Sequence, residues 1–506
     1  HERLVGSEMC IRDSSRRGET GKGGSETTMK ENRKTLRIGF APTRRVLTTP
    51  KAFSTDEALR IKKEVEEYVK KFQDVEWVNL DSINKEGLLF QVSDVNAASE
   101  LFKNKKVDAV FFPFCNFGSE EAVAKMAREV GKPVLVWGPR DEAPDENGDR
   151  LRDAQCGMFA LTKVLQQFRV KYTYISNCWM TDKKFDIGFE NFLGAVSIVK
   201  ALNHLRIGQI GVRPDAFWSV KANERELMEK FGIEIHPITL ATLDEMLKIN
   251  LTENNHLVRE EVDSLKERFP KNKYSEDIWT KMANLKLTIK KWCEDNHLSA
   301  VSAECWKPMA TVAGISVCFT FSELTGEGIP VVCESDIHGA VSSVIAAAAA
   351  RYSSATFLAD LTIRHPVNDN AELLWHCGVF PRVLSDDPDA EIELHFNRKT
   401  AAVGQWELKH DDITVVRFDG GNGKYSCLFG HGRGVDGPKT FGTYLWAEFD
   451  NWPLWERRFM EGPYIHHCVG VYGKVAPRIW EACKYIPELE ADPVKPDEKE
   501  IRDFLM

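Results

Sequence analysis

The stretch 107-VDAVFFPF-114 decides the fold of the N-terminal part of this chain. Its apolar residues follow one another almost without interruption, which is typical of a strand in a parallel sheet that is covered on both faces. Helical and strand patterns alternate on either side of it, at 37–41, 54–72, 76–80, 93–104, 119–130 and 133–137. This βαβαβαβ alternation predicts a doubly wound α/β domain.

A second unit of the same kind is expected further along the chain. Its strands are predicted at 172–176, 207–212 and 330–333, and its helices at 151–168, 189–205, 224–230, 243–296 and 311–325. The strand 330–333 ends at Glu334, and α/β folds carry their functional side chains at the carboxyl ends of strands. After residue 357 the pattern changes to short alternating segments with Gly and Asp between them, which predicts antiparallel β structure.

The predicted fold class is therefore α/β, with two doubly wound, Rossmann-like α/β domains followed by a smaller antiparallel β-rich C-terminal domain. A chain of 506 residues is too long for one core, which supports several domains. We expect a disordered or non-native tail at 1–35, an N-terminal α/β domain at 36–170, and a central α/β domain at 171–356. A β-rich domain with a closing helix is expected at 357–506.

Composition excludes several classes of partner. Lys and Arg number 67 and Asp and Glu 76, so the net charge is 67 − 76 = −9, which argues against nucleic-acid or anionic-membrane binding. The apolar run 341–350 is too short to span a bilayer, and no signal peptide is evident. The 12 Cys residues include no Cys-x-x-Cys pair, which favours reduced thiols in the cytoplasm.

Three short segments place polar ligands among apolar residues: 332-VCESD-336, 357-FLAD-360 and 465-IHH-467. A carboxylate in such surroundings is costly to bury unless a charge compensates it. Two carboxylates and an imidazole together suit a divalent cation such as Mn²⁺ or Mg²⁺, and the imidazole favours Mn²⁺. Such a cation, with a carboxylate on either side, can drive proton transfer next to a carbonyl.

Each carboxylate also has a plain structural interpretation. Glu334 precedes a long helix, and a carboxylate at a helix N-terminus is favoured by the helix dipole. Asp336 lies two residues further on and could be the ligand instead of Glu334. Asp360 could be an ordinary turn residue at the end of a strand. The residues alone leave these alternatives open.

The histidines carry the same ambiguity. His376 lies in an apolar stretch, where a lone His is more often a hydrogen-bonded core residue than a ligand. His466 and His467 precede a strand-like run. Adjacent residues on a strand face opposite ways, so at most one of the two is expected to bind a metal.

Taken together and in order, these segments resemble the L-fucose isomerase and L-arabinose isomerase superfamily. In that family a strand ends in a Glu-containing segment, and a Phe-x-x-Asp or Phe-Met-Glu segment follows at a spacing like the one here, 360 − 334 = 26 residues. A late His precedes an apolar run with a Gly, as in 465-IHHCVG-470. The arabinose branch adds a further His, close to where His376 lies. The resemblance spans roughly residues 36 to 487.

The resemblance implies roles for these residues. Glu334 and Asp360 would be both the catalytic acid–base pair and metal ligands, with His467 as the third ligand and His376 as an additional candidate. Mn²⁺ is the implied cofactor, with Mg²⁺ or Co²⁺ as alternatives. The residues expected to orient the ligands from behind are Asp336, His338 and His466.

The resemblance also points to residues that contact the sugar. The segment 303-AECW-306 lies where the family has a sugar-contacting Gln, so Glu304 and Trp306 are substrate-binding candidates. Further substrate-binding candidates are Arg44 and Arg45 after the first strand, Asn116 in a loop expected to reach a neighbouring subunit's site, and Arg433 in 430-GHGRG-434.

The function implied is that of a metal-dependent aldose–ketose isomerase, which acts on an open-chain sugar through a cis-enediol. A cytoplasmic homo-oligomer, trimer or hexamer, is implied with it. The sugar stays open among fucose, arabinose, related aldoses and a sulfonated hexose such as sulfoquinovose, whose anion Arg44, Arg45 or Arg433 could hold. The alternatives from other classes are a non-catalytic sugar-binding protein and a different metal-dependent enzyme, such as an aldolase or hydrolase.

Overall fold

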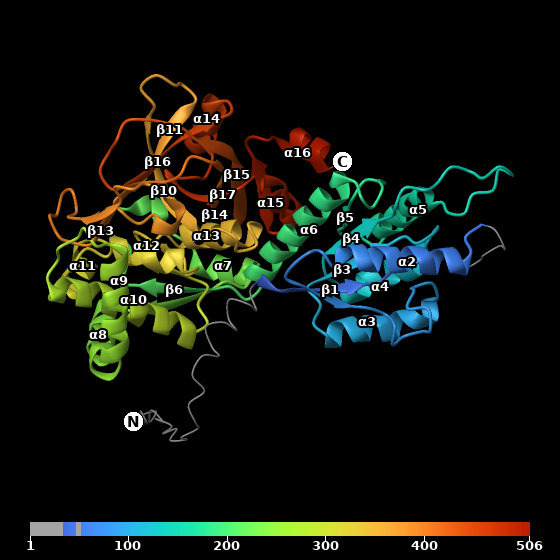
Figure 1. Cartoon of the computed structure of the whole chain (residues 1–506), viewed down its shortest axis with the longest axis horizontal. Helices are drawn as coiled ribbons and strands as arrows, with labels where there is room; N and C mark the ends of the chain where they lie inside the picture. The colour runs from blue at the N-terminus through green and yellow to red at the C-terminus, as the bar shows by residue number, and fades with distance from the viewer. Residues whose placement is uncertain (1–33, 47–51, 506) are drawn as a thin grey trace, which may run out of the picture.

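A computed structural model describes residues 34–46 and 52–505 of the chain (Figure 1). The predicted tail therefore lies almost wholly outside the described residues. Within them, no single helix is long and apolar enough to cross a membrane, although one bent pair of short helices passes that test by length and composition.

The first unit is a five-stranded parallel sheet with the order β2-β1-β3-β4-β5. Its strands are β1 (Leu36–Phe40), β2 (Val75–Val78), β3 (Ala109–Pro113), β4 (Val134–Trp137) and β5 (Thr173–Tyr174). The helices of this unit are α2 (Thr55–Val69), α3 (Val95–Asn104), α4 (Glu120–Val130) and α5 (Ala154–Gln167). Every residue of β3 is buried, because helices cover both faces of the sheet, as its apolar sequence predicted.

The second unit is a four-stranded parallel sheet with the order β7-β6-β8-β9. Its strands are β6 (Arg206–Ile210), β7 (Glu234–Ile238), β8 (Ala300–Ala303) and β9 (Val331–Val332). Its helices are α6 (Lys183–Leu202), α7 (Glu224–Phe231), α8 (Leu240–Glu253), α9 (Asn255–Arg268), α10 (Glu276–Asp295), α11 (Lys307–Ala313), α12 (Cys318–Gly326) and α13 (Ile337–Ala349). The single helix predicted at 311–325 is wrong, because Gly314 takes a left-handed conformation (φ 68°) that ends α11.

The C-terminal part is an antiparallel barrel with attached strands. The strands β16-β11-β10-β17-β14-β15 form a continuous series, and β15 also pairs with β16, so six strands close on themselves. They are β10 (Thr356–Arg364), β11 (Ala371–His376), β14 (Asp412–Gly421), β15 (Lys424–Gly434), β16 (Thr443–Phe449) and β17 (His467–Tyr472). Closure removes the exposed edges that an open antiparallel sheet would have.

Shorter elements complete this part of the chain. The strands β12 (Glu391–Glu393), β13 (Val403–Glu407) and β18 (Leu489–Pro493) extend the barrel sheet at its edges. The helices are α14 (Trp452–Glu461), α15 (Ala476–Cys483) and α16 (Glu498–Leu505), and α15 packs against α6. The mixed α/β fold with parallel units and a β-rich C-terminal part is confirmed, whereas the predicted domain boundaries stay predictions.

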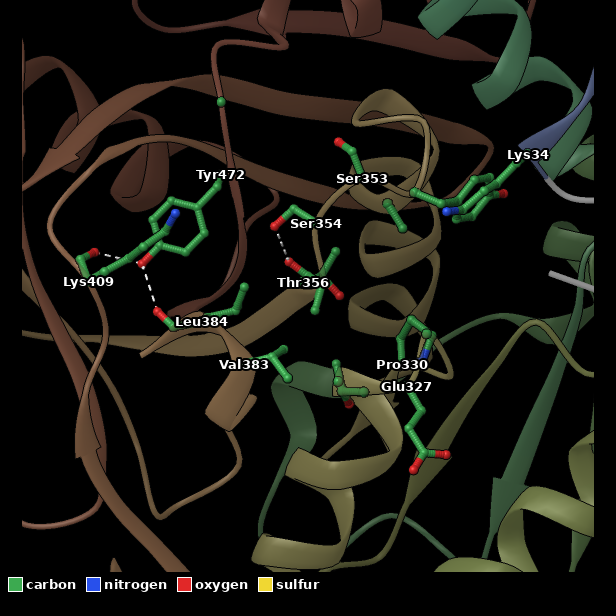
Figure 2. Close-up of a pocket in the computed structure, with 17 residues that line it drawn as sticks. Lys34, Glu327, Pro330, Ser353, Ser354, Thr356, Val383, Leu384, Lys409 and Tyr472 are labelled. Atoms are coloured by element: carbon green, nitrogen blue, oxygen red, sulfur yellow. Dashed lines mark hydrogen bonds between the residues drawn. The ribbon is translucent and has the colours of Figure 1, made fainter. Parts of the chain in front are cut away.

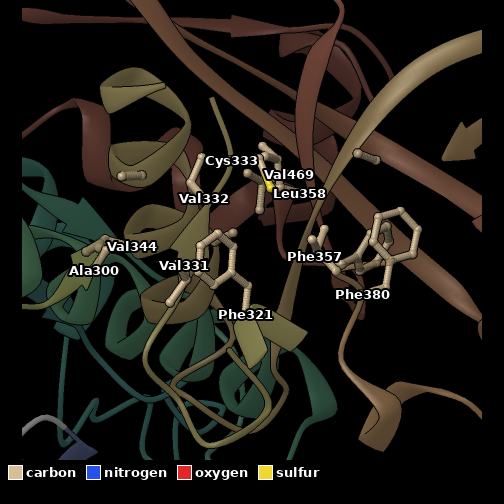
Figure 3. Close-up of a cluster of buried hydrophobic side chains, with 14 of the residues drawn as sticks. Ala300, Phe321, Val331, Val332, Cys333, Val344, Phe357, Leu358, Phe380 and Val469 are labelled. Carbon is tan, nitrogen blue, oxygen red and sulfur yellow. The ribbon is translucent and has the colours of Figure 1, made fainter. Parts of the chain in front are cut away.

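One apolar core joins the second unit to the barrel. Figure 3 shows Val332 and Cys333, at the end of β9, beside Leu358 of β10 and Val469 of β17. Helix α13 packs across strands β14 and β17 of the barrel. The end of β9 is therefore held rigidly at the barrel, and the residues that follow it face the ends of barrel strands.

Candidate active site

A strained turn presents Glu334 after strand β9. Glu334 (φ 65°) and Ser335 (φ 54°) both adopt the left-handed conformation, which costs free energy for residues other than Gly. Asp336 then caps α13, since its Oδ1 accepts a hydrogen bond of 2.9 Å from the Gly339 amide. A Cβ at Gly339 would lie 2.6 Å from Asp336 Oδ2, so the cap leaves no room for a side chain there.

Strands β10 and β17 bring the other two predicted ligands together. Asp360 and His467 are directly opposite residues in this antiparallel pair, so their side chains project from the same face. His467 Nε2 lies 3.0 Å from Glu334 Oε2 and 3.4 Å from Asp360 Oδ1. Three segments that are far apart in the sequence therefore converge at one point.

The donor atoms at this point fit a divalent cation. Asp360 Oδ1 and His467 Nε2 are buried and have no hydrogen-bond partner. Such atoms are costly unless something else binds them. Ligand bonds of about 2.1 Å at right angles place neighbouring donors about 3 Å apart, close to the separations around His467 Nε2. The mixture of two carboxylates and an imidazole suits Mn²⁺.

His466 also faces this point, contrary to the expectation that only one of the two neighbouring histidines could. Strand β17 begins at His467, so the alternation of a strand does not apply to His466. The two imidazole rings lie 4.6 Å apart, and the ligand atoms of Asp360, His466 and His467 all lie within 4.8 Å of one another. The structure therefore offers His466 as a further donor, with its side chain 46% exposed.

His376 ends strand β11 and is buried. Its Nδ1 accepts a hydrogen bond of 2.9 Å from the Cys377 amide, and its Nε2 is buried without a partner. Asp360 and Glu334 are both close enough to influence its pKa. His376 therefore borders the cluster with one free ring nitrogen.

A chain of buried charges supports His467 from behind. His467 Nδ1 lies 2.9 Å from Asp336 Oδ2, and Asp336 in turn accepts two hydrogen bonds from Arg417 of β14. Arg417 also donates to Asp419, whose other oxygen lies 2.9 Å from His338 Nδ1. Asp336 and His338 thus lie behind the cluster, and an acceptor at Nδ1 leaves Nε2 of His467 as the ligand nitrogen.

Arg417 and Asp419 were not foreseen from the sequence. Arg417 is completely buried, and it interrupts the apolar run of β14 at 415-VVRFD-419. An Arg in a strand that is otherwise buried needs a paired charge, so this interruption was an available signal.

The charges of this network shift the pKa values of the site. Burial raises the pKa of Asp336, but Arg417 and His467 outweigh it and hold that pKa far below its usual range. Burial lowers the pKa of His467, but the nearby carboxylates of Asp336 and Glu334 outweigh it and raise that pKa to about 9. These opposing influences make the protonated imidazolium the stable form when no cation competes for Nε2.

The two candidate acid–base residues shift in opposite directions. Burial raises the pKa of Asp360. Burial has the same effect on Glu334, but His467 and its neighbours outweigh it and lower that pKa. Trp306 contributes by donating from its indole Nε1 to Glu334 Oε1 at 3.1 Å. Environments that separate two carboxyl pKa values in this way are typical of acid–base pairs.

An aromatic wall borders the cluster on the side of the second unit. The ring of Phe217, in the loop after β6, lies 5.5 Å from the His467 ring and 6.2 Å from the Trp306 ring. Sequence reasoning missed Phe217, which lies in no motif of its own. Glu304 is buried, and its Oε2 accepts from the Val212 amide at 3.2 Å, so it holds the start of this loop.

The predicted N-terminal contacts lie elsewhere in the chain. Arg44, Arg45 and Asn116 belong to the loops after β1 and β3, which lie on the far side of α6 from the barrel (Figure 1). Arg44 is bound to both carboxylate oxygens of Glu86, at 2.6 and 3.0 Å. The Arg45 guanidinium lies over the Phe117 ring, at 4.3 Å from its centroid. Within one chain, none of the described contacts connects these residues to Glu334.

The structure places Arg433 at the opposite end of the barrel, so it does not join this site within one chain. It pairs across the sheet with Asp412, beyond the Tyr472 end of β17, whereas His467 begins that strand. The Gly-rich segment around Arg433 is part of strand β15, which carries this residue away from His467, and a role for Arg433 in sugar binding stays a prediction.

Comparison with known proteins gives consistent relatives. Residues 46–203 match the family model for the N-terminal domain of fucose and sulfoquinovose isomerases. Sulfoquinovose isomerases from Priestia aryabhattai and Priestia megaterium are each 27% identical over 406 residues, which is 79% of this chain and 88% of theirs. The enzyme of the same name from Alkalicoccus urumqiensis is 26% identical over 66% of this chain and 74% of its own.

A solved structure gives no further guide. An ABC transporter solute-binding protein from Burkholderia multivorans aligns over 55% of this chain and 82% of its own, at 11% identity and a TM-score of 0.15, which is too low to carry an argument. This chain is similar in sequence to fucose and sulfoquinovose isomerases.

Proposed function

We propose that this protein is a metal-dependent aldose–ketose isomerase whose substrate is a sulfonated hexose such as sulfoquinovose. The observation that carries the reaction type is the convergence of Glu334, Asp360 and His467, of which Asp360 and His467 each have a buried ligand atom without a hydrogen-bond partner. The similarity to sulfoquinovose isomerases over 79% of the chain supports the substrate class.

Glu334, Asp360 and His467 would hold the divalent cation, with His466 and His376 as the neighbouring donors. When bound, Mn²⁺ would polarise the carbonyl and the adjacent hydroxyl of the open-chain sugar. The cation's charge also favours the ionised form of the carboxylates that surround it.

The two carboxylates supply the proton transfer. One of Glu334 and Asp360 would remove the C2 proton of the aldose while the other donates a proton to O1, which gives the enediol. Delivery of a proton to C1 and loss of the O2 hydroxyl proton would then form the ketose without an external oxidant. Positioned groups of this kind contribute roughly 10²–10⁴-fold to rate. Trp306 holds Glu334 in place, and the Phe217 and Trp306 rings exclude water from one side of the sugar.

Arg45 is the best placed of the predicted cations to hold a sulfonate. Arg44 is committed to Glu86, whereas the Arg45 guanidinium rests on an aromatic ring at the carboxyl edge of a parallel sheet. This is the crevice between β1 and β3, where the strand order 2-1-3-4-5 reverses, and such switch points commonly bind ligands. In a homo-oligomer, Arg45 of one subunit would bind the sulfonate of a sugar held at Glu334, Asp360 and His467 of the neighbouring subunit.

The reaction is tested by incubating the protein with Mn²⁺ in D₂O and a panel of sulfoquinovose, L-fucose and L-arabinose. We expect ketose formation and deuterium at the transferred position, followed by NMR, with sulfoquinovose preferred. Prior removal of metal by EDTA should abolish both signals. Binding of sugar without isotope exchange would instead support a sugar-binding protein.

The shared site is tested by mixing two inactive variants. Glu334→Gln chains lack the base, and Arg45→Ala chains lack the anion contact. If the site is built from two subunits, mixed oligomers contain some intact sites, and activity reappears after the variants are unfolded and refolded together. Each variant refolded alone is the control. Absence of any recovery would place Arg45 outside the site.

A further inference from the structure

A pair of thiols lies directly beside the metal cluster and has no part in the proposed reaction. Cys318 is the first residue of α12 and is completely buried, while Cys377 follows the end of β11 and is half-buried. Their Sγ atoms lie 3.5 Å apart. The residues are 59 positions apart in the sequence, so the contact joins the second unit to the barrel.

Both thiols are held in place by one segment of backbone. The start of α12 is fixed by Ser316 and Phe319, whose amides donate to the carbonyls of Ala401 and Ala402 at 2.8 and 3.1 Å. The same segment continues to Gly404, whose amide donates to the carbonyl of Gly378 at 3.2 Å, next to Cys377. The proximity of the two sulfur atoms is therefore set by the local structure on both sides.

We infer that Cys318 and Cys377 form a reversible disulfide when the protein meets a peroxide, and that this bond is an oxidation switch beside the metal cluster. A disulfide has an S–S length of about 2.05 Å, so each sulfur has to move by less than about 1 Å from its present position. Rotation about χ1 supplies a movement of that size without displacing a strand.

The chemistry balances with hydrogen peroxide as the oxidant. The Sγ of Cys377, the less buried residue of the pair, attacks a peroxide oxygen, the O–O bond breaks, and sulfenic acid and one water are formed. The Cys318 thiol then attacks that sulfur and expels a second water as the S–S bond forms. Two electrons pass from the two thiols to the peroxide, and a dithiol reductant reverses the change.

The bond would alter the neighbourhood of His376. Cys377 Sγ now lies 3.3 Å from His376 Nδ1 and would move away from it toward Cys318. The end of β11 would also become covalently tied to α12. The resulting loss of turnover rests on the proposed function, whereas formation of the disulfide does not.

The test uses a Cys156→Ser background, because Cys156 is exposed and would react independently. The protein is oxidised with hydrogen peroxide, unfolded in an alkylating agent, digested and mapped by mass spectrometry. We expect one disulfide-linked peptide pair containing Cys318 and Cys377, and the loss of two of the remaining 12 − 1 = 11 thiols. Dithiothreitol should restore both thiols.

Two single variants complete the design. Cys377→Ser and Cys318→Ala should each prevent the cross-linked peptide and the loss of paired thiols, while a variant at an unrelated half-buried cysteine, Cys483→Ser, leaves both unchanged. A linked pair between other cysteines would overturn the inference, as would intact Cys318 and Cys377 thiols at a peroxide dose that fully oxidises Cys156 in the unsubstituted protein. If the disulfide forms but turnover persists, the disulfide itself is confirmed, and the claim that it switches off the enzyme is overturned.

Discussion

The two ends of the barrel differ in how completely their polar groups are paired. At the end where β17 begins, Asp360 Oδ1, His467 Nε2 and His376 Nε2 are all buried without hydrogen-bond partners. At the other end lies a cavity of about 650 Å³, larger than anything needed for a metal ion (Figure 2).

Several polar side chains of that cavity already have partners. The Tyr472 hydroxyl donates to the Lys409 carbonyl at 2.6 Å, and the Ser354 hydroxyl donates to the Ala355 carbonyl at 3.0 Å (Figure 2). Volume alone would select this end as the active site. Catalysis, however, needs side chains that are fixed in position and still have free atoms to bind a metal ion or substrate. The comparison therefore favours the small cluster over the large cavity.

The largest expected effect comes from Glu334→Gln. The change keeps the shape of the side chain but removes a base and a cation ligand, so turnover should fall by roughly 10³-fold or more. Ketose formation is followed by NMR, and circular dichroism checks the fold. Ser354→Ala at the cavity end is the matched control and should retain full activity. A similar loss of turnover in both variants would contradict the assignment of the active site to the His467 end of the barrel.

Arg417→Met should have the next largest effect, on stability. Arg417 has no exposure and pairs with Asp336 and Asp419, so its removal leaves two buried carboxylates with only a neighbouring histidine each to compensate their charge and costs about 3–5 kcal/mol. Arg433→Met, on the adjacent strand at the cavity end, removes an exposed Arg and should change stability by less than about 0.5 kcal/mol. Urea unfolding of both variants measures the difference, and equal values would contradict the structural role of the charged chain.

His467→Ala should weaken Mn²⁺ binding by at least about 100-fold, because it removes a buried ligand nitrogen at the centre of the cluster. His466→Ala should weaken it less, since that side chain is half exposed and lies 3.9 Å from Asp360. Calorimetric titration of the metal-free proteins gives both affinities. The reverse order would make His466 the principal ligand.

The sequence predicted the first parallel unit well because its signals are local, but in the second unit it missed strands β7 and β8 and included the segment 172–176, whose strand β5 belongs to the first sheet. The apolar stretch 107–114 became the buried strand β3, and Glu334 does follow a strand. Glu334, Asp360 and His467 could be recognised in the sequence because each follows or begins a short apolar run. Their common location was supplied by the family resemblance, since no local pattern specifies which strands of a barrel are neighbours.

Other features depended on tertiary structure and could not be predicted in this way. Closure of the barrel through β15 and β16 decides that Arg433 lies far from His467, and this is a long-range pairing. The start of β17 at His467 decides that His466 faces the cluster, and strand ends are set by their neighbours. Arg417 was a visible anomaly in an apolar run, but its partner Asp336 lies 81 residues away.

The pH dependence of metal binding provides a smaller effect that sharpens the comparison. Because the pKa of His467 is raised to about 9, a proton must leave before Nε2 can bind a cation. Mn²⁺ affinity should rise about tenfold per pH unit between pH 7 and 9 and then level off. The stability of the metal-free protein should instead fall as the pH rises. Because the pKa of His467 is higher in the folded protein than its ordinary value near 6.5, the protonated imidazole stabilises the fold. This contribution is fully present below pH 6.5 and is lost as the pH rises through about 9. In His467→Ala both trends should disappear, and their persistence would assign them to another group.

The smallest expected effect is at the cavity. Val383 lines the cavity and is 71% exposed. It makes none of the described contacts with Glu334, Asp360 or His467. Val383→Trp should therefore fill part of the cavity without disturbing a paired polar group. We expect kcat/KM and Mn²⁺ affinity to stay within about twofold of the unsubstituted values, because the two ends are separated by the length of strand β17. Steady-state kinetics and calorimetry measure these quantities. A large fall in kcat/KM with unchanged metal affinity would mean that the sugar reaches the cavity end, and pairing of polar groups would then be the wrong guide to the site.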